Sequence, residues 1–279
     1  MAYSLTFNVR KLDSDGRHND RNFDLEKAPH IDKDKSDHNR YWNYQNDKEK
    51  SFLEIEKDFY RENFSKTIEL QNERNNKARH QERNKSLDDY YKDRLTRPED
   101  VLIQIGDKDK HIREKELWKV AEKYKEELER KYGDNCKVLT MALHIDEKTP
   151  HVHMRRVWVH EHDGIKEVSK NAALEKDIQF SRNNEETSKT RYNNPSIAFT
   201  RMERDMVKDI CKEQGIELTK ENKSRGYDLT KDQARERDRE LAEREERLAE
   251  LEKEIEAKKK ELERLKQREE KEISLNKVD

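Results

Sequence analysis

Short segments of the chain alternate apolar and polar residues, which is the pattern of half-buried β-strands. Four strands are predicted in this way, at residues 3–9, 101–105, 137–145 and 150–159. Other segments repeat their apolar residues near the period of an amphipathic helix. They predict one or two helices within residues 49–95, a helix at 113–131, an irregular helix at 171–185 and another at 197–214. The order of these elements favours an α+β fold with a mostly antiparallel central sheet and flanking helices.

Two polar segments interrupt these elements. Residues 10–50 form a stretch that is long for a structureless loop, and such loops tend to be functional or disordered. Residues 181–196, rich in Asn, Ser, Thr and charge, are predicted to form a second loop.

The character of the chain changes near residue 231, where Gly and Pro cease and charged residues dominate. Apolar residues then recur every seven positions, which predicts a coiled-coil seam; they are Leu241, Leu248, Ile255 and Leu262. A homodimer through this seam and a single solvated charged helix are both open interpretations. We expect a main domain at residues 1–228 and a charged coiled-coil or helical tail at 229–279.

The composition limits how much of the chain can be buried. Charged residues make up 45% of the sequence and hydrophobic residues 30%, with a mean hydropathy of -1.46. The chain can therefore bury one modest core, and much of the remainder must be exposed. The formal net charge of -2 excludes a strongly basic field over the whole molecule. A nucleic-acid site would need a local basic patch.

The compartment can be predicted from cysteine usage and from the absence of targeting patterns. The two cysteines, Cys136 and Cys211, are far apart in the sequence, which indicates a reducing compartment without a disulfide framework. The first residues lack the charged and apolar regions of a signal peptide. No apolar run approaches the roughly 20 residues that a membrane-spanning helix needs. We expect a cytoplasmic protein with no membrane span.

Three of the ten histidines lie within residues 144–153. On the predicted strand at residues 137–145, every second residue is apolar and faces the core; these residues are Leu139, Met141, Leu143 and Ile145. His144 therefore points to the opposite face of the sheet. His151 and His153 are two residues apart on the next strand and share a face. If the two strands pair antiparallel, the three imidazoles converge. A single histidine would ordinarily be a surface or core residue, but this arrangement predicts a three-histidine metal site with open positions.

At these residues the chain resembles a known family. The stretch His144–His153, with the hydrophobic Val152 between two histidines, is similar to the signature of the Mob/Pre (MobV-type) plasmid mobilisation relaxases, which belong to the HUH endonuclease superfamily. Arg17–Arg21 resembles the first motif of that family, and Asn43–Tyr44 resembles the second. The resemblance covers about residues 1–230 and implies an HUH relaxase-like domain followed by a coiled-coil tail.

The resemblance also implies a reaction. Such a relaxase nicks one strand of plasmid DNA at an origin of transfer by metal-dependent transesterification, and later rejoins it. The family suggests Mn²⁺ or Mg²⁺, held by His144, His151 and His153, to stabilise the charge at the scissile phosphate. From the ligands alone Zn²⁺ is as natural. Asp146 would fix the tautomer of one ligand, or else cap the turn.

Further roles follow from the same resemblance. His18 would be the nucleophile and would form a covalent 5′-phosphoryl-histidine, with Tyr44 and then Tyr41 as alternatives. Arg21 would bind the phosphate or hold the loop. Glu147 would orient or deprotonate the nucleophile.

Binding of DNA needs basic and aromatic residues near the site, because they neutralise phosphates and stack on bases. The candidates lie after the histidines, at the end of the first strand, in a later basic cluster and in the long polar segment; they are Arg155, Arg156, Arg10, Lys11, Lys220, Lys223, Arg225, Tyr227, Tyr41 and Trp42. The expected partner is plasmid origin-of-transfer DNA, single-stranded or supercoiled.

Two other functions compete with this interpretation. A rolling-circle replication initiator or a transposase can carry the same metal hairpin, but it usually needs a tyrosine on a helix after the hairpin. Tyr192 is the nearby candidate and lies in an Asn-rich segment, which counts against it. A non-catalytic DNA-binding and oligomerisation protein is the third possibility, because charged helices dominate the composition.

Overall fold

The chain divides into two units, Met1–Lys220 and Glu221–Asp279. A computed structural model describes residues 2–11, 16–28, 31–133, 135–175, 177 and 195–219 of the first unit. In the second it describes residues 247, 251, 255, 258 and 259, which are helical. Leu251 and Ile255 are exposed there. The coiled coil and the domain boundary after residue 228 stay predictions, because most of the residues concerned lie outside the described ones.

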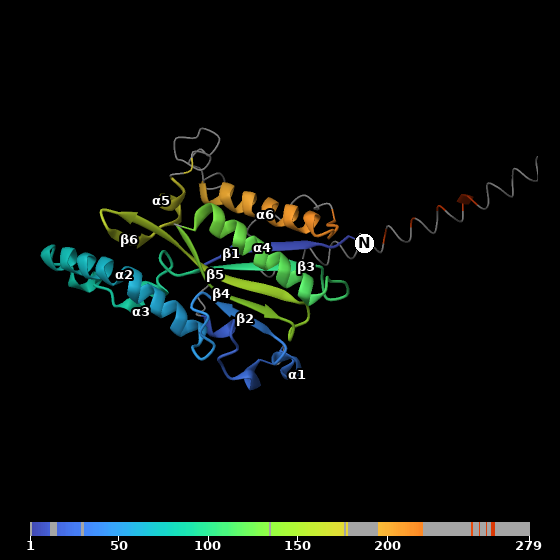
Figure 1. The fold of residues 1–279 in the computed structure, drawn as a ribbon, viewed down its shortest axis with the longest axis horizontal. Helices are drawn as coiled ribbons and strands as arrows, with labels where there is room; N and C mark the ends of the chain where they lie inside the picture. Colours follow the sequence, from blue (N-terminus) through green and yellow to red (C-terminus); the bar gives the residue numbers. More distant parts are fainter. Residues whose placement is uncertain are drawn as a thin grey trace, which may run out of the picture. The chain divides into compact units, whose positions relative to one another are not determined.

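The first unit is built on a six-stranded antiparallel sheet (Figure 1). Its strand order is β1-β3-β5-β4-β2, and β6 pairs with the far end of β5. The strands are β1 (Leu5–Arg10), β2 (Arg40–Asn43), β3 (Glu99–Ile105), β4 (Cys136–His144), β5 (His151–His162) and β6 (Ile165–Val168). The predicted antiparallel α+β architecture is confirmed. The sequence did not predict β2, a short strand inside the long polar segment, or β6.

Six α-helices are described, and two of the three longest, α2 and α6, begin at clear start signals. Ser51 precedes α2 in a capping box with Glu54, and Pro195 opens α6, where its missing N–H costs no hydrogen bond. The helices are α1 (Lys33–Ser36), α2 (Phe52–Lys77), α3 (Leu87–Lys92), α4 (Glu114–Tyr132), α5 (Lys170–Leu174) and α6 (Pro195–Glu213). The helix predicted at 171–185 is described only as far as the short α5. Among the described residues, no helix is long and apolar enough to cross a membrane.

The two faces of the sheet are covered differently. On one face, α4 and α6 enclose the main core; its large members include Phe7, Ile103, Trp118, Tyr124, Met141, Met154, Trp158 and Phe199. On the other face, α2 and α3 pack over a smaller cluster that includes Phe59, Tyr60, Phe64, Tyr90 and Tyr91. Figure 1 shows α2 and α3 extending beyond the sheet. The rest of this second face carries the histidines.

A β-bulge in β4 changes the predicted alternation. Val138 pairs with Arg156 and Thr140 with Arg155, so that Leu139 is an extra residue in the ladder. Leu139 therefore packs in the α2–α3 cluster, and the prediction that it shares a face with Met141 is wrong.

Candidate functional site

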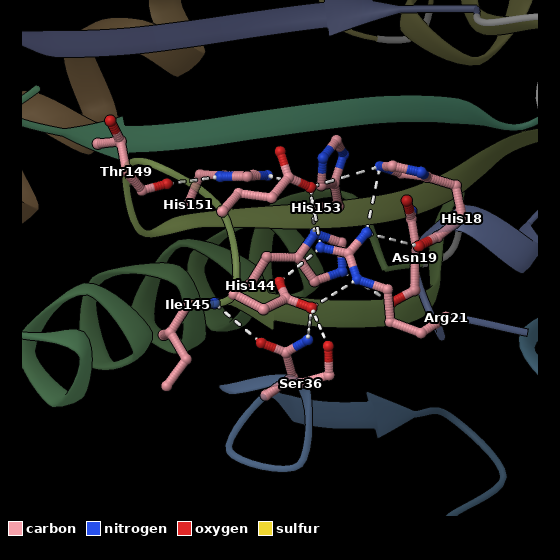
Figure 2. Close-up of polar contacts among 12 residues, drawn as sticks. His18, Asn19, Arg21, Ser36, His144, Ile145, Thr149, His151 and His153 are labelled. Atoms are coloured by element: carbon pink, nitrogen blue, oxygen red, sulfur yellow. Dashed lines mark hydrogen bonds and ion pairs between the residues drawn. The ribbon is translucent and has the colours of Figure 1, made fainter. Parts of the chain in front are cut away.

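The ends of β4 and β5 bring the three predicted metal-binding histidines together. His144 and His151 are directly paired across the two strands, and His153 follows on the same face. Their ring centroids lie 5.1 to 5.3 Å apart. The convergence expected from strand parity is confirmed, and Figure 2 shows the three rings facing one region.

Hydrogen bonds fix the tautomers of two of these rings. His151 Nδ1 lies 2.8 Å from the carbonyl oxygen of Thr149, which can only accept, so this nitrogen carries the proton. His153 Nδ1 lies 2.8 Å from Asp100 Oδ2. Burial raises the pKa of Asp100, but His153, Arg155 and Asn19 together outweigh that effect and the pKa is lowered, so the carboxylate is ionised and accepts. Both histidines therefore keep the Nε2 lone pair for a metal ion.

The third ring is oriented from the opposite nitrogen. His144 Nε2 donates to the backbone carbonyl of Asn19 at 2.9 Å. Its Nδ1 is buried, and no described residue gives it a hydrogen bond. Burial, together with the Arg21 guanidinium, lowers the pKa of His144 to about 2, so the ring is neutral. A buried, neutral imidazole with an unpartnered lone pair fits a metal ligand.

Glu147 lies at the centre of this group. Its Oε1 atom is 3.8 Å from His18 Nε2, 3.9 Å from His144 Nδ1 and 4.0 Å from His151 Nε2. It also accepts a hydrogen bond of 2.8 Å from Arg21. Burial raises the pKa of Glu147, but His151 and Arg21 outweigh it and hold the pKa below its usual value. The structure thus brings the predicted Glu147 to the site.

Two sets of three residues place their possible ligand atoms within 4.8 Å of one another. One set is His18, His144 and His153, and the other is His144, Glu147 and His151. The predicted triad is spread over both sets, which share His144. Imidazole and carboxylate ligands together suit divalent ions such as Mn²⁺ or Zn²⁺. The donor chemistry therefore fits the predicted cofactor.

His18, the predicted nucleophile, lies beside the ligands although it is distant in sequence. It ends a short 3₁₀ helix, Gly16–His18, and its ring centroid is 5.8 Å from that of His144 and 5.9 Å from that of His153. Burial and the Arg21 guanidinium lower the pKa of His18. A neutral imidazole has a lone pair available for attack.

Arg21 anchors the His18 loop to the turn between β4 and β5 (Figure 2). Its guanidinium donates to both carboxylate oxygens of Asp146, at 2.6 and 2.9 Å. Asp146 also accepts from Asn39 at 2.7 Å and Ser36 at 2.9 Å. In the described structure Asp146 therefore holds Arg21, and the predicted bond to a ligand histidine is made by Asp100 instead.

Asn19 joins the loop that carries His18 to His144 directly and to His153 through Asp100. Its carbonyl orients His144, and its side-chain Nδ2 donates to Asp100 Oδ1 at 3.3 Å. We expect Asn19→Ala to weaken Mn²⁺ binding about tenfold, because partners of a ligand histidine typically carry effects of this size. Isothermal titration calorimetry would measure it.

The matched control is Asn22→Ala, which changes an exposed residue of the same type in the same loop. Equal Mn²⁺ affinity for Asn19→Ala and Asn22→Ala would contradict the assignment.

Arg155 does not reach solvent. It is 2% exposed, and its guanidinium donates to both oxygens of Glu56 on α2, at 2.7 and 3.0 Å. It also contacts the hydroxyl of Tyr91. The prediction that Arg155 contacts DNA is wrong, because its charge is used to fix α2 to the sheet.

Arg156 is fully buried on the opposite face of the sheet. It donates to Glu203 of α6 at 3.0 Å, to Glu99 at 3.0 Å and to the Tyr124 hydroxyl at 2.9 Å. The predicted DNA contact by Arg156 is wrong for the same reason.

The predicted aromatic residues are separated by the structure. Tyr41 is 41% exposed and is paired across from Ala142, on the histidine face. Trp42 packs in the main core on the other face, with Lys125 Nζ 4.6 Å from its ring centroid. The prediction that Trp42 stacks on a base at this site is therefore wrong.

Tyr44 lies away from the histidines. Its backbone N–H bonds to Leu139, five residues before His144, and its ring packs on Phe59 at 5.8 Å. Its hydroxyl accepts from Gln45 at 3.0 Å. The structure thus does not bring the alternative nucleophile Tyr44 to the site.

The predicted basic residues outside β5 differ in position. Arg10 is exposed and is paired across from Asp100, on the histidine face. Lys11 donates to the carbonyl of Leu95 at 2.5 Å, and burial lowers its pKa. Lys223 and Arg225 lie outside the described residues, as do Lys220 and Tyr227.

Sequence reasoning missed several residues of the site. Asp100 could have been found from the sequence, because it is a carboxylate that directly precedes the alternating apolar residues of β3. Asn39 and Ser36 gave no signal, since they lie in the polar segment where many residues are of the same type. Phe23, whose ring stacks on His18, was likewise missed.

The fold formed by this sheet and its helices is similar to that of a solved relaxase domain. It is similar to two Mn-bound crystal structures of the MobM relaxase domain (MOBV; Mob_Pre) bound to plasmid pMV158 oriT DNA, one with a 22-nucleotide strand and one with a 3′-thiophosphate added. Both matches have a TM-score of 0.50 and cover 84% of this chain and 98% of the chain of the MobM relaxase domain, at 18% and 19% identity. No family model and no curated protein matches the sequence. The likeness confirms the predicted resemblance at the level of the fold.

Proposed function

We propose that the protein is a DNA relaxase, which nicks one strand at an origin of transfer and rejoins it. The observation that carries the proposal is the position of His18: its neutral imidazole lies against His144 and His153, next to a second set of possible metal ligands formed by His144, Glu147 and His151. The MobM relaxase domain, whose fold this chain shares, is bound to oriT DNA and Mn in its crystal structures.

His18 is the nucleophile in this proposal. Its Nε2 atom faces Glu147 and Arg21, toward the region where the scissile phosphate would lie. The lone pair attacks phosphorus, the N–P bond forms, and the bond from phosphorus to the 3′ oxygen breaks. The products are a 5′-phosphoryl-histidine and a 3′ hydroxyl, which takes its proton from water. The reverse attack by a 3′ hydroxyl rejoins the strand.

The chain's own residues prepare this step. Arg21 holds the His18 loop through Asp146 and keeps His18 neutral, and Glu147 orients the imidazole. A divalent ion, Mn²⁺ or Mg²⁺, held by His144, His151 and His153, would supply Lewis-acid stabilisation of the phosphate charge.

The DNA strand would lie across the exposed part of the histidine face. Arg10 would neutralise a phosphate there, and Tyr41 would stack on a base, because both are exposed on this face. Lys11, Lys223 and Arg225 remain proposed phosphate contacts. A homodimer through residues 229–279 also remains a prediction.

A plasmid relaxation assay tests the proposal. Segments of the DNA that flanks the protein's own gene are cloned into a supercoiled plasmid and incubated with the full chain. We expect one segment to be converted to the open circular form with Mn²⁺ or Mg²⁺, and conversion to stop with EDTA. Mass spectrometry of the DNA-linked peptide should locate the adduct on His18.

Binding of one segment without any relaxation in Mn²⁺ or Mg²⁺ would contradict the proposal. It would favour a non-catalytic DNA-binding protein instead.

A further inference from the structure

Exposed large apolar side chains are few in the described part of the first unit. They are Phe23, Tyr41 and Leu95, with 37%, 41% and 69% of their surface exposed. Two of the three are aromatic, and both lie at the histidine site. Tyr41 lies at the edge of the histidine face, and Phe23 stacks on the nucleophile itself.

The Phe23 ring is nearly parallel to the His18 ring. The two planes make an angle of 14°, with centroids 5.9 Å apart, which is an offset stack. The exposed part of Phe23 is thus the apolar surface that lies next to the attacking imidazole.

The backbone holds Phe23 in this exposed position. Its N–H bonds to the carbonyl of Arg21 at 2.9 Å, and the N–H of Asn22 bonds to Arg17 at 2.9 Å. Arg21 has a left-handed backbone with φ 58° and is tied to Asp146. The ring is therefore presented by an anchored turn, so a ligand that stacks on it need not order the loop first.

The surroundings decide what kind of ligand the ring fits. Its chain neighbours Asn22 and Asp24 are exposed and polar, so the apolar surface is about one ring wide. A protein interface would need a larger contiguous apolar patch. A nucleobase matches one ring, and base–aromatic stacking tolerates any base because each has a π-face.

We propose that Phe23 is a stacking platform for the base of a nucleotide next to the scissile phosphate. The inference rests on the proposed relaxase function, because it places the DNA strand at His18. Base, Phe23 and His18 then form one continuous stack, which holds both the strand and the nucleophile at the reacting phosphate.

The first test compares two fluorescent probes, a short oligothymidylate and an abasic strand of equal length, by anisotropy with EDTA present. We expect the full wild-type chain to prefer the strand with bases. Phe23→Leu should reduce that preference about tenfold, which corresponds to the loss of one stacked base. Phe23→Trp should retain it, and the exposed control Leu95→Ala should leave it unchanged.

The salt dependence of binding separates this role from a general structural one. Its slope reports the phosphate contacts, which Phe23→Leu does not alter, so the slope should stay constant. An unchanged preference for bases in Phe23→Leu, or a changed salt slope, would overturn the proposal that Phe23 stacks on a base. So would a wild-type chain that shows no preference for bases.

Abasic scanning gives the position of the base on the strand whose nick has been mapped. One position beside the nick should lose affinity in the wild type and lose nothing further in Phe23→Leu. If no plasmid is nicked but Phe23 still controls the preference for bases, the proposed relaxase function is wrong and the proposal that Phe23 stacks on a base is supported. If nicking occurs and Phe23→Leu behaves as wild type in both assays, the platform alone fails.

Discussion

Replacing His18 with alanine is expected to lower plasmid nicking by about a thousandfold or more and to abolish the covalent DNA adduct, because the attacking atom is removed. Binding of Mn²⁺ should persist, since His144, Glu147 and His151 form a ligand set without His18. Gel analysis of plasmid topology and of protein–DNA adducts would measure the first effect, and calorimetry the second.

The matched control is Tyr44→Phe, which removes only a hydroxyl that contacts Gln45. It should nick at the wild-type rate. An adduct mapped to Tyr44 or Tyr41, or adduct formation that persists in His18→Ala, would show that another residue is the nucleophile.

The second large effect is on stability. Glu56→Leu leaves the buried guanidinium of Arg155 without its carboxylate partner. We expect the free energy of unfolding to fall by about 3 to 5 kcal/mol, which is the usual cost of an uncompensated buried charge. Circular dichroism during urea denaturation would measure this difference.

The double variant Glu56→Leu with Arg155→Met should recover most of the lost stability, because it removes both charges and keeps the volume apolar. Asp58→Ala, on the same helix, breaks surface ion pairs with Lys50 and Arg61 and should leave the denaturation midpoint nearly unchanged. A single variant as stable as wild type would show that the ion pair does not fix α2.

The histidine site was the most predictable part of the chain, because strand parity places side chains without any knowledge of long-range contacts. His144, His151 and His153 converge as the alternation predicts. The position of His18 came from the family resemblance alone. No local pattern indicates that a loop residue more than a hundred positions earlier packs against β4.

The arginines after the histidines show where local reasoning fails. Arg155 and Arg156 looked like phosphate ligands because they are basic and follow the site directly. Their partners, Glu56 and Glu203, lie on helices far away in the sequence. In a chain with 45% charged residues, many carboxylates could pair with each arginine, so the pattern alone does not identify the buried pairs.

The extra residue at Leu139 has a consequence for any comparison of this chain with its relatives. Before the bulge, even-numbered residues of β4 face α4, and after it odd-numbered residues do. Deleting Leu139 alone would leave every other residue of β4 with its present partner on β5, so that Val138 stays in the helix-covered core and His144 stays on the histidine face. An alignment can therefore place a gap at Leu139 and keep both Val138 and His144 on their present faces of the sheet.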